Sequence, residues 1–195
     1  MKLRFAIAVF GTLCCSIGSA AAEWALSSDE SQINFVSVKA GEIPESHHFK
    51  TLNGGVDANG DAVIKIALDS VETMIDIRNE RMREFLFETD QYPTASITAS
   101  INLDGLEKLT VGEREKIELS GQLDFHGVKA PVDTTLIVTR IADNRVLVET
   151  NSPIILYTEE YNLAAGVAKL MELASLPSIT PASPVTASLV FERKE

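Results

Sequence analysis

The sequence predicts an all-β protein in which about eight antiparallel strands are interrupted by two short helical segments. Apolar and polar residues alternate with a period of two, most clearly over residues 95–103, 117–125 and 185–192, as is typical of half-buried strands. Strands with one wet and one dry face indicate an antiparallel sheet. Turn-forming residues separate the runs: Asn53-Gly54-Gly55, Asn59-Gly60, Asp104-Gly105 and Gly127.

Weaker alternation adds further strands around Ile33 and Phe35 and over residues 64–68, 132–138 and 146–148. Such a set of strands forms either a sandwich or a closed barrel. The cysteine and tryptophan spacing of an immunoglobulin sandwich is missing. Several small residues fall on the dry faces, where they would either leave room for a ligand inside a barrel or taper a filled core: Ala95, Ala99, Gly121 and Ala187.

Two stretches lack the alternation and are predicted to be helical. Residues 76–87 are rich in Arg and Glu and end in an aromatic cluster. Residues 162–176 carry apolar side chains at helical spacing, and prolines follow before the last strand. The apolar positions of this second segment are Val167, Leu170, Met171 and Ala174.

Length and charge narrow the function classes. The 195 residues suit one domain. The chain has 17 basic and 28 acidic residues, a formal charge of −11 at pH 7. This charge argues against nucleic-acid binding, which needs a basic surface to displace counterions from phosphates. Strong attraction to an anionic membrane surface is disfavoured for the same reason.

The first 22 residues are predicted to be a cleavable export signal. A basic start over residues 1–4 precedes an apolar run over residues 5–13, and small residues end the segment at Ala22. The apolar run is too short for a permanent membrane anchor. Both cysteines, Cys14 and Cys15, lie inside this signal. We therefore expect a periplasmic mature domain over residues 23–195, with no thiol chemistry and no stable membrane anchor.

No pattern of catalytic or metal-ligating residues stands out. Adjacent residues of a strand point to opposite faces, so His47 and His48 are a poor metal pair, and we interpret them as part of a polar loop. The remaining histidine, His126, is predicted to serve with Tyr92 as a structural hydrogen-bonding residue. The sequence predicts no metal, no cofactor and no catalytic residue.

The stretch from Ser70 to Pro93 holds three arginines, Arg78, Arg81 and Arg83, beside Phe85 and Phe87. In one interpretation the arginines coat a solvated helix and the phenylalanines plug one end of a barrel. In the other, the aromatic rings form the apolar lip of a cavity and an arginine meets an anionic head group.

At these residues the chain resembles the YceI family of exported, lipocalin-like lipid-binding proteins. The resemblance covers essentially the whole mature chain. It departs from the family pattern at Asn79, where Asp is frequent, at Leu86, within the usual Phe-Phe, and at Tyr161-Asn162, where an aromatic-Gly pair is common. The matching motifs, in order, are Trp24 with Ile33 and Phe35, Ser70-Val71-Glu72-Thr73, Arg78-Asn79, Phe85-Leu86-Phe87, Tyr92-Pro93, residues 119–132 and the segment 163–179.

The resemblance implies an eight-stranded antiparallel lipocalin-like β-barrel with two short helical insertions and an apolar tunnel. The implied ligand is a long amphiphile, namely a polyisoprenoid, an isoprenoid quinone or a fatty-acid derivative, which the protein carries or sequesters without catalysis. On this basis Arg78 is the head-group candidate. The candidates for lining the cavity are Phe35, Phe85, Phe87, Leu123, Phe125 and Leu170.

Two other function classes remain open from the sequence. One is a small periplasmic hydrolase or isomerase with its site at the barrel mouth, and the other is a partner-binding scaffold. Turnover that depends on a histidine would favour the enzyme, and lipid that copurifies with the protein would favour the carrier. A homodimer is compatible with the sequence but not required by it.

Overall fold

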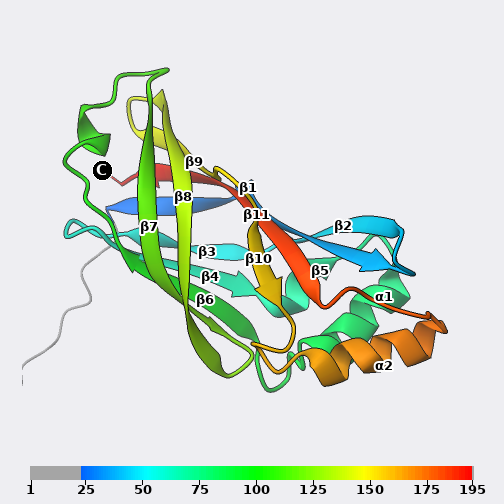
Figure 1. Ribbon diagram of the computed structural model, residues 1–195. Helices are drawn as coiled ribbons and strands as arrows, with labels where there is room; N and C mark the ends of the chain where they lie inside the picture. Colours follow the sequence, from blue (N-terminus) through cyan, green and yellow to red (C-terminus); the bar gives the residue numbers. More distant parts are fainter. Residues whose placement is uncertain (1–22, 195) are drawn as a thin grey trace, which may run out of the picture.

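The computed structural model describes residues 23–194, and its main element is a closed antiparallel barrel (Figure 1). Strand β11 pairs back onto β1 and so closes a ring of eight strands, which confirms the predicted fold class. The predicted export signal lies outside the described residues. In their order around the ring the strands are β1 (Trp24–Lys39), β3 (Leu52–Val56), β4 (Asp61–Ala67), β6 (Thr94–Ser100), β7 (Arg114–Phe125), β8 (Val128–Ala142), β9 (Arg145–Thr150) and β11 (Ala182–Arg193).

The sheet continues beyond the ring at one end because β1 and β11 are long. Their pairing shifts register between Ser27 and Gln32, and past this irregularity each strand takes a further partner. The second half of β1 pairs with β2 (Ile43–Phe49), which in turn pairs with β5 (Val71–Glu72). The first half of β11 pairs with β10 (Ile154–Tyr157). We call this part of the sheet the extension.

Two helical segments lie together at the end of the molecule that carries the extension (Figure 1). The first comprises α1 (Asp76–Arg81) and the π-helical turn η2 (Met82–Leu86), and the second is α2 (Ala164–Ala174). Both predicted helical stretches are thereby confirmed. Short 3₁₀ turns occur at η1 (Leu68–Ser70) and η3 (Leu106–Lys108). Among the described residues, no helix combines the length and apolar character needed to cross a membrane.

The opposite end of the barrel is closed by Trp24, which is buried. The guanidinium groups of Arg140 and Arg193 lie 5.3 and 5.4 Å from the centroid of its indole ring. Arg140 also donates hydrogen bonds to the carbonyls of Leu106 and Asp143. Both cations lie within the range of a cation–π interaction with the indole, which stabilises the buried ring at this end.

One predicted turn is wrong. Asn53-Gly54-Gly55 lies inside strand β3 and pairs with β4 instead of reversing the chain. A Cβ at Gly54 would lie only 2.2 Å from the carbonyl oxygen of Val63. Gly54 therefore allows the close approach of β3 and β4.

Gly166 fixes how closely α2 packs on η2. It is buried in the helix, and an added Cβ would lie 2.4 Å from the carbonyl oxygen of Phe85. In an unobstructed helix Gly→Ala stabilises by roughly 0.5–1 kcal/mol. At this contact we expect the opposite sign: Gly166→Ala lowers the unfolding free energy by about 1–3 kcal/mol, because α2 must move away from η2. Urea unfolding measures the sign, and a stabilised variant would show that the contact is not tight.

Candidate ligand-binding cavity

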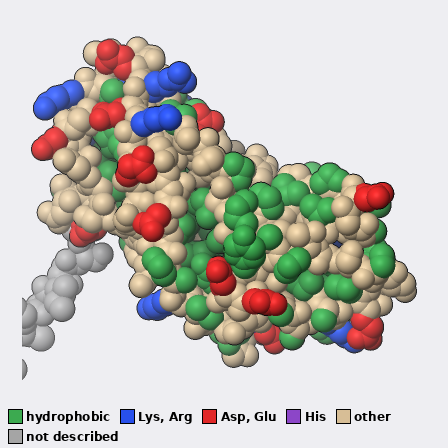
Figure 2. Space-filling model, viewed as in Figure 1, with side chains coloured by type: hydrophobic (Ala, Val, Ile, Leu, Met, Phe, Trp, Pro, Cys, Tyr) green, Lys and Arg blue, Asp and Glu red, His purple; other side chains and the backbone are tan. Residues whose placement is uncertain are grey.

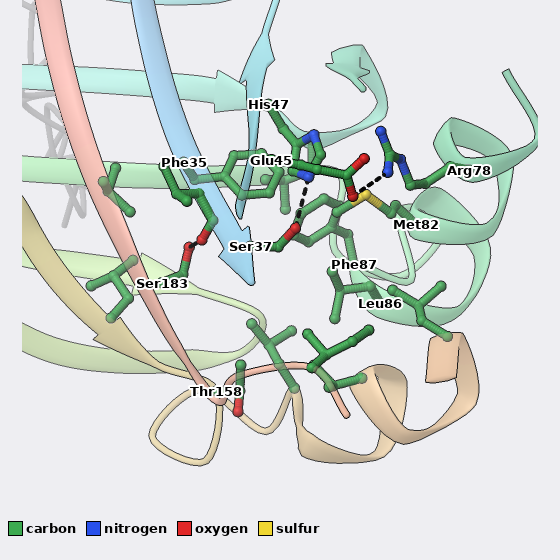
Figure 3. A pocket seen from close by; sticks show the side chains of 18 of the residues that line it. Phe35, Ser37, Glu45, His47, Arg78, Met82, Leu86, Phe87, Thr158 and Ser183 are labelled. Atoms are coloured by element: carbon green, nitrogen blue, oxygen red, sulfur yellow. Dashed lines mark hydrogen bonds and ion pairs between the residues drawn. The ribbon is translucent and has the colours of Figure 1, made fainter. Parts of the chain in front are cut away.

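A cavity of about 410 Å³ lies between the extension and the two helical segments (Figure 3). This volume falls within the range of small-molecule sites, roughly 300–1,000 Å³. Strands β1, β2 and β11 supply one wall, and α1, η2 and α2 supply the facing wall. The lining is predominantly apolar, and includes Ile33, Phe35, Phe49, Ile66, Leu68, Met82, Leu86, Phe87, Ala95, Leu123, Phe125, Leu156, Leu163, Val167, Leu170 and Val185.

Four phenylalanine rings gather in the cavity wall. Phe87 comes from the end of the helical segment and is only 4% exposed. Its ring centroid lies 5.6 Å from that of Phe49, 6.1 Å from that of Phe125 and 6.3 Å from that of Phe35. These separations are typical of favourable aromatic pairs. The rings therefore give the cavity a rigid apolar wall.

The π-helical turn decides which residues of 85–87 face the cavity. The amide of Phe87 donates to the carbonyl of Met82, five residues back, with a distance of 2.8 Å. A turn with this wider spacing rotates the following side chains relative to an α-helix. As a result Leu86 and Phe87 line the cavity. Phe85 is half-buried and is not among the lining residues, and its backbone packs against Gly166.

The other residues that the sequence singled out as cavity-lining candidates are brought together in this cavity. Apart from Phe85, every one of them contributes to its wall: Phe35, Phe87, Leu123, Phe125 and Leu170, with Arg78 beside them. Their role in holding a ligand stays a prediction. Ala95, which the sequence placed on a dry face, also lines the cavity, whereas sequence reasoning missed Met82 and His47.

His47 points into the cavity from strand β2, so the interpretation of His47 and His48 as a polar loop is wrong. The ring of His47 is 2% exposed and lies 5.1 Å from that of Phe35. Its Nε2 is hydrogen-bonded to Ser37 Oγ at 2.9 Å (Figure 3). The alternation of β2 was a usable signal, because His47 stands two residues before Phe49 and hence on the same face.

Desolvation, together with the Arg78 guanidinium, lowers the pKa of His47 to about 4 from its ordinary 6.5. Between these two values the unfolded chain binds a proton that the folded chain does not. The contribution of neutral His47 to the unfolding free energy is therefore fully present above pH 6.5. It is lost as the pH is lowered towards 4, and the total loss is roughly 3 kcal/mol. We expect urea unfolding at pH 7 and pH 4.5 to show a smaller difference for His47→Gln than for the wild type. Equal differences would exclude His47 as the source.

Arg78 lies in the cavity wall, but its charge is already engaged. Its Nη1 is 2.8 Å from a carboxylate oxygen of Glu45, and its Nη2 donates to the carbonyl of Thr73 at 2.7 Å. Lys39 pairs with the same carboxylate at 2.9 Å. The two cations hold the pKa of Glu45 below its usual range, although burial opposes them by raising it. The head-group role of Arg78 therefore stays a prediction, and any head group would have to share this cation with Glu45.

Asn79, where the family pattern often has Asp, is buried and structural. Its Oδ1 accepts hydrogen bonds from the Thr73 amide at 2.8 Å and from Thr73 Oγ1 at 2.6 Å. Its Nδ2 donates to Glu72 Oε1 at 2.9 Å. The side-chain amide of Asn79 can donate to the Glu72 carboxylate. An aspartate at position 79 would instead repel that carboxylate.

His126 and Tyr92 lie side by side, and their role as structural hydrogen-bonding residues stays a prediction. The Nδ1 atom of His126 is 3.1 Å from the carbonyl oxygen of Tyr161, and its ring centroid is 4.3 Å from that of Tyr92. Over residues 23–194, no three His, Cys, Asp or Glu side chains come together in a way that could hold a metal ion.

A second cavity of about 140 Å³ lies further along the barrel interior. On β4, Ile66 lines the first cavity and Ile64 lines the second. On β11, Val185 lines the first cavity and Ala187 lines the second. The two cavities therefore follow one another along the barrel, between the mouth near the helices and the closed end at Trp24.

A family model described as the YceI-like domain matches residues 24–191. The chain belongs to the YceI-like family. This confirms the resemblance that the motifs indicated, over nearly all of the described residues. A polyisoprenoid binding domain from Saccharophagus degradans, implicated in plant cell wall breakdown, is 39% identical in sequence. Its structure superposes with a TM-score of 0.87 and covers 89% of this chain and 100% of its own.

Solved structures of lower sequence identity share the fold of this YceI-like chain. BcnA from Burkholderia cenocepacia is 17% identical, with a TM-score of 0.66 and coverage of 85% of this chain and 98% of its own. The YceI protein of Campylobacter jejuni is 15% identical, with a TM-score of 0.56 and coverage of 76% and 85%. At these identities the likeness concerns the fold alone. None of the curated proteins compared with the chain matches it.

Proposed function

We propose that this protein binds the apolar tail of a polyisoprenoid or another long amphiphile in the 410 Å³ cavity. The observation that carries the proposal is the apolar lining, with four phenylalanine rings and few polar groups. Each methylene moved from water into such a lining contributes about 0.8 kcal/mol, so a long chain gains enough to bind firmly. The relative from Saccharophagus degradans, which is a polyisoprenoid binding domain, supports this ligand class.

We further propose that the protein acts as an exported carrier. The basic start, the apolar run and the small residues before Glu23 support a cleaved signal and a periplasmic location. N-terminal sequencing of the protein from a periplasmic fraction should give Glu23 as its first residue. A mature chain that still begins at Met1 in the cytoplasm would contradict this part of the proposal.

The alternative of a small hydrolase has one observation in its favour, the 2.9 Å contact between Ser37 Oγ and His47 Nε2. A nucleophilic serine needs a histidine that accepts its proton and a third group that orients the ring. The pKa of His47 is lowered to about 4, which makes it a weak base. Within residues 23–194, its Nδ1 has no hydrogen-bond partner that could orient it. These features support binding over catalysis at this site.

The experiment that tests the binding proposal is mass spectrometry of an organic extract of the protein purified from periplasm. We expect a long-chain lipid in near-stoichiometric amount, and its mass identifies the class among polyisoprenoids, isoprenoid quinones and fatty-acid derivatives. Ser37→Ala separates the two functions, because a carrier keeps its lipid in this variant. Ester or thioester hydrolysis by the wild type that is lost in Ser37→Ala would favour the enzyme instead.

A further inference from the structure

Three apolar side chains stand exposed beside the cavity, on the chain that leads from β5 into α1. Met74 is 79% exposed, Ile75 is 44% exposed and Ile77 is 52% exposed. Ile75 and Ile77 also line the cavity, which places them on its rim. Large apolar side chains that lie close together in the chain and contact water mark interaction surfaces. We call these three residues the rim cluster.

A polar network that is anchored on the buried side chains of Thr73 and Asn79 holds the rim cluster in place. Met74 has a positive φ of 61°, which is unusual for a residue other than glycine. Its amide donates to Glu72 Oε1 at 2.7 Å, the same carboxylate oxygen that accepts from Asn79. Asn79 in turn holds Thr73 through two hydrogen bonds. The outward position of Met74 is therefore fixed by the fold and is not a frayed loop.

Charge around the rim indicates which partner suits it. Asp76 is exposed between the two isoleucines, whereas the cations Lys39 and Arg78 share the Glu45 carboxylate. The third cation of the cavity wall, Arg81, is half-buried and donates to the carbonyl of Leu173. The whole chain carries a formal charge of −11. An apolar patch with an exposed carboxylate fits a zwitterionic lipid surface, whose outermost groups are cationic ammonium groups above acyl chains. An anionic lipid surface would repel it.

The surface view agrees with this placement. On the face shown in Figure 2, hydrophobic side chains gather over the half of the molecule that carries the extension and the helices, as a comparison with Figure 1 shows. Most of the Lys and Arg side chains visible on that face lie over the opposite end of the barrel. The end with the cavity is thus the less charged end of this face.

We propose that the rim cluster docks the protein onto the interface of a zwitterionic lipid bilayer, with the mouth of the cavity facing the acyl chains. A long apolar cargo then passes between membrane and cavity without crossing water, where its solubility is very low. This inference rests on the proposed binding function, and it names the partner from which the same cavity is loaded.

Tryptophan reporters test the docking directly. The only native tryptophan, Trp24, is buried at the closed end of the barrel, so Met74→Trp places a second, exposed indole on the rim. Phosphatidylcholine vesicles with brominated acyl chains should quench Met74→Trp and leave Val111→Trp unquenched. Val111 is the matched control because it is also exposed but lies in the loop before β7, far from the cavity (Figure 1). Equal quenching of both variants, or of neither, would overturn the proposal.

Transfer kinetics separate docking from binding. Met74→Asn removes the apolar side chain and keeps a residue that tolerates a positive φ, and Met74 does not line the cavity. We expect vesicle binding and transfer of a fluorescent prenyl probe between phosphatidylcholine vesicles to fall about tenfold. Probe affinity in solution should be unchanged, and Val111→Asn should behave as the wild type.

The remaining outcomes are also decisive. If the wild type has no affinity for the probe in solution, the proposed binding function is wrong. If its affinity is normal and Met74→Asn transfers the probe as fast as the wild type, only the docking proposal is wrong. Replacement of part of the phosphatidylcholine by phosphatidylglycerol should weaken vesicle binding, and stronger binding would contradict the charge argument. A wild-type dimer in sedimentation equilibrium that becomes a monomer in Met74→Asn would assign the rim cluster to a second copy of the chain, and would overturn the membrane proposal.

Discussion

Truncation of Phe87 to alanine is expected to lower the unfolding free energy by about 3–5 kcal/mol, as for other buried aromatic residues. The ring is 4% exposed and contacts the rings of Phe35, Phe49 and Phe125, so its removal leaves a void that the rigid sheet does not fill. Against a typical domain stability of about 5–15 kcal/mol this is a large loss. Urea unfolding followed by circular dichroism measures it.

Phe85→Ala is the matched control for this prediction. Phe85 is two residues away in the same helical segment, but it is half-buried and does not line the cavity. We expect a clearly smaller loss for Phe85→Ala than for Phe87→Ala. The reverse order would show that the π-helical turn does not orient residues 85–87 as described.

Enlargement of Ala95 to leucine is expected to weaken the binding of a long-chain ligand by tenfold or more. Ala95 is buried and lines the cavity from β6. The longer side chain takes the space of two or three ligand methylenes, each worth about 0.8 kcal/mol, which amounts to roughly 2 kcal/mol of binding free energy. Fluorescence titration of delipidated protein with a prenyl or fatty-acyl probe measures the change.

Ala187→Leu serves as the companion variant, because Ala187 lines the second, smaller cavity deeper in the barrel. We expect short-chain probes to bind this variant as they bind the wild type. Ala95→Leu should keep the β-sheet circular dichroism of the wild type, since the added atoms enter space that is already open. Unchanged affinity in Ala95→Leu with an intact fold would show that the ligand lies elsewhere.

Much of the fold could be predicted from the sequence because strand alternation is a local property. The runs now seen as β6 and β7 alternate between more and less exposed positions, and turn residues separate most of the strands. The glycines of β3 were misread as a turn, whereas Gly54 allows the close approach of β4. That approach depends on a neighbouring strand and leaves no local mark in the sequence.

The site could be predicted only in part. Phe35, Leu123 and Phe125 lie on dry strand faces, so alternation placed them inside the barrel. Phe85 and Phe87 could not be told apart, because the π-helical turn Met82–Leu86 decides which of them faces the cavity. Composition also could not decide whether the barrel is hollow or filled. The cavity depends on the long strands β1 and β11, which extend the sheet beyond the ring towards the helices.

The central claim is that the cavity between the extension and the helices holds a long apolar ligand. The most direct measurement is titration of the delipidated, folded protein with a fluorescent prenyl probe, with an unlabelled polyisoprenoid as competitor. We predict saturable binding of one probe per chain, displacement by the competitor and no saturable binding of short polar analogues. A folded protein that shows no saturable uptake of any long-chain probe would contradict the account.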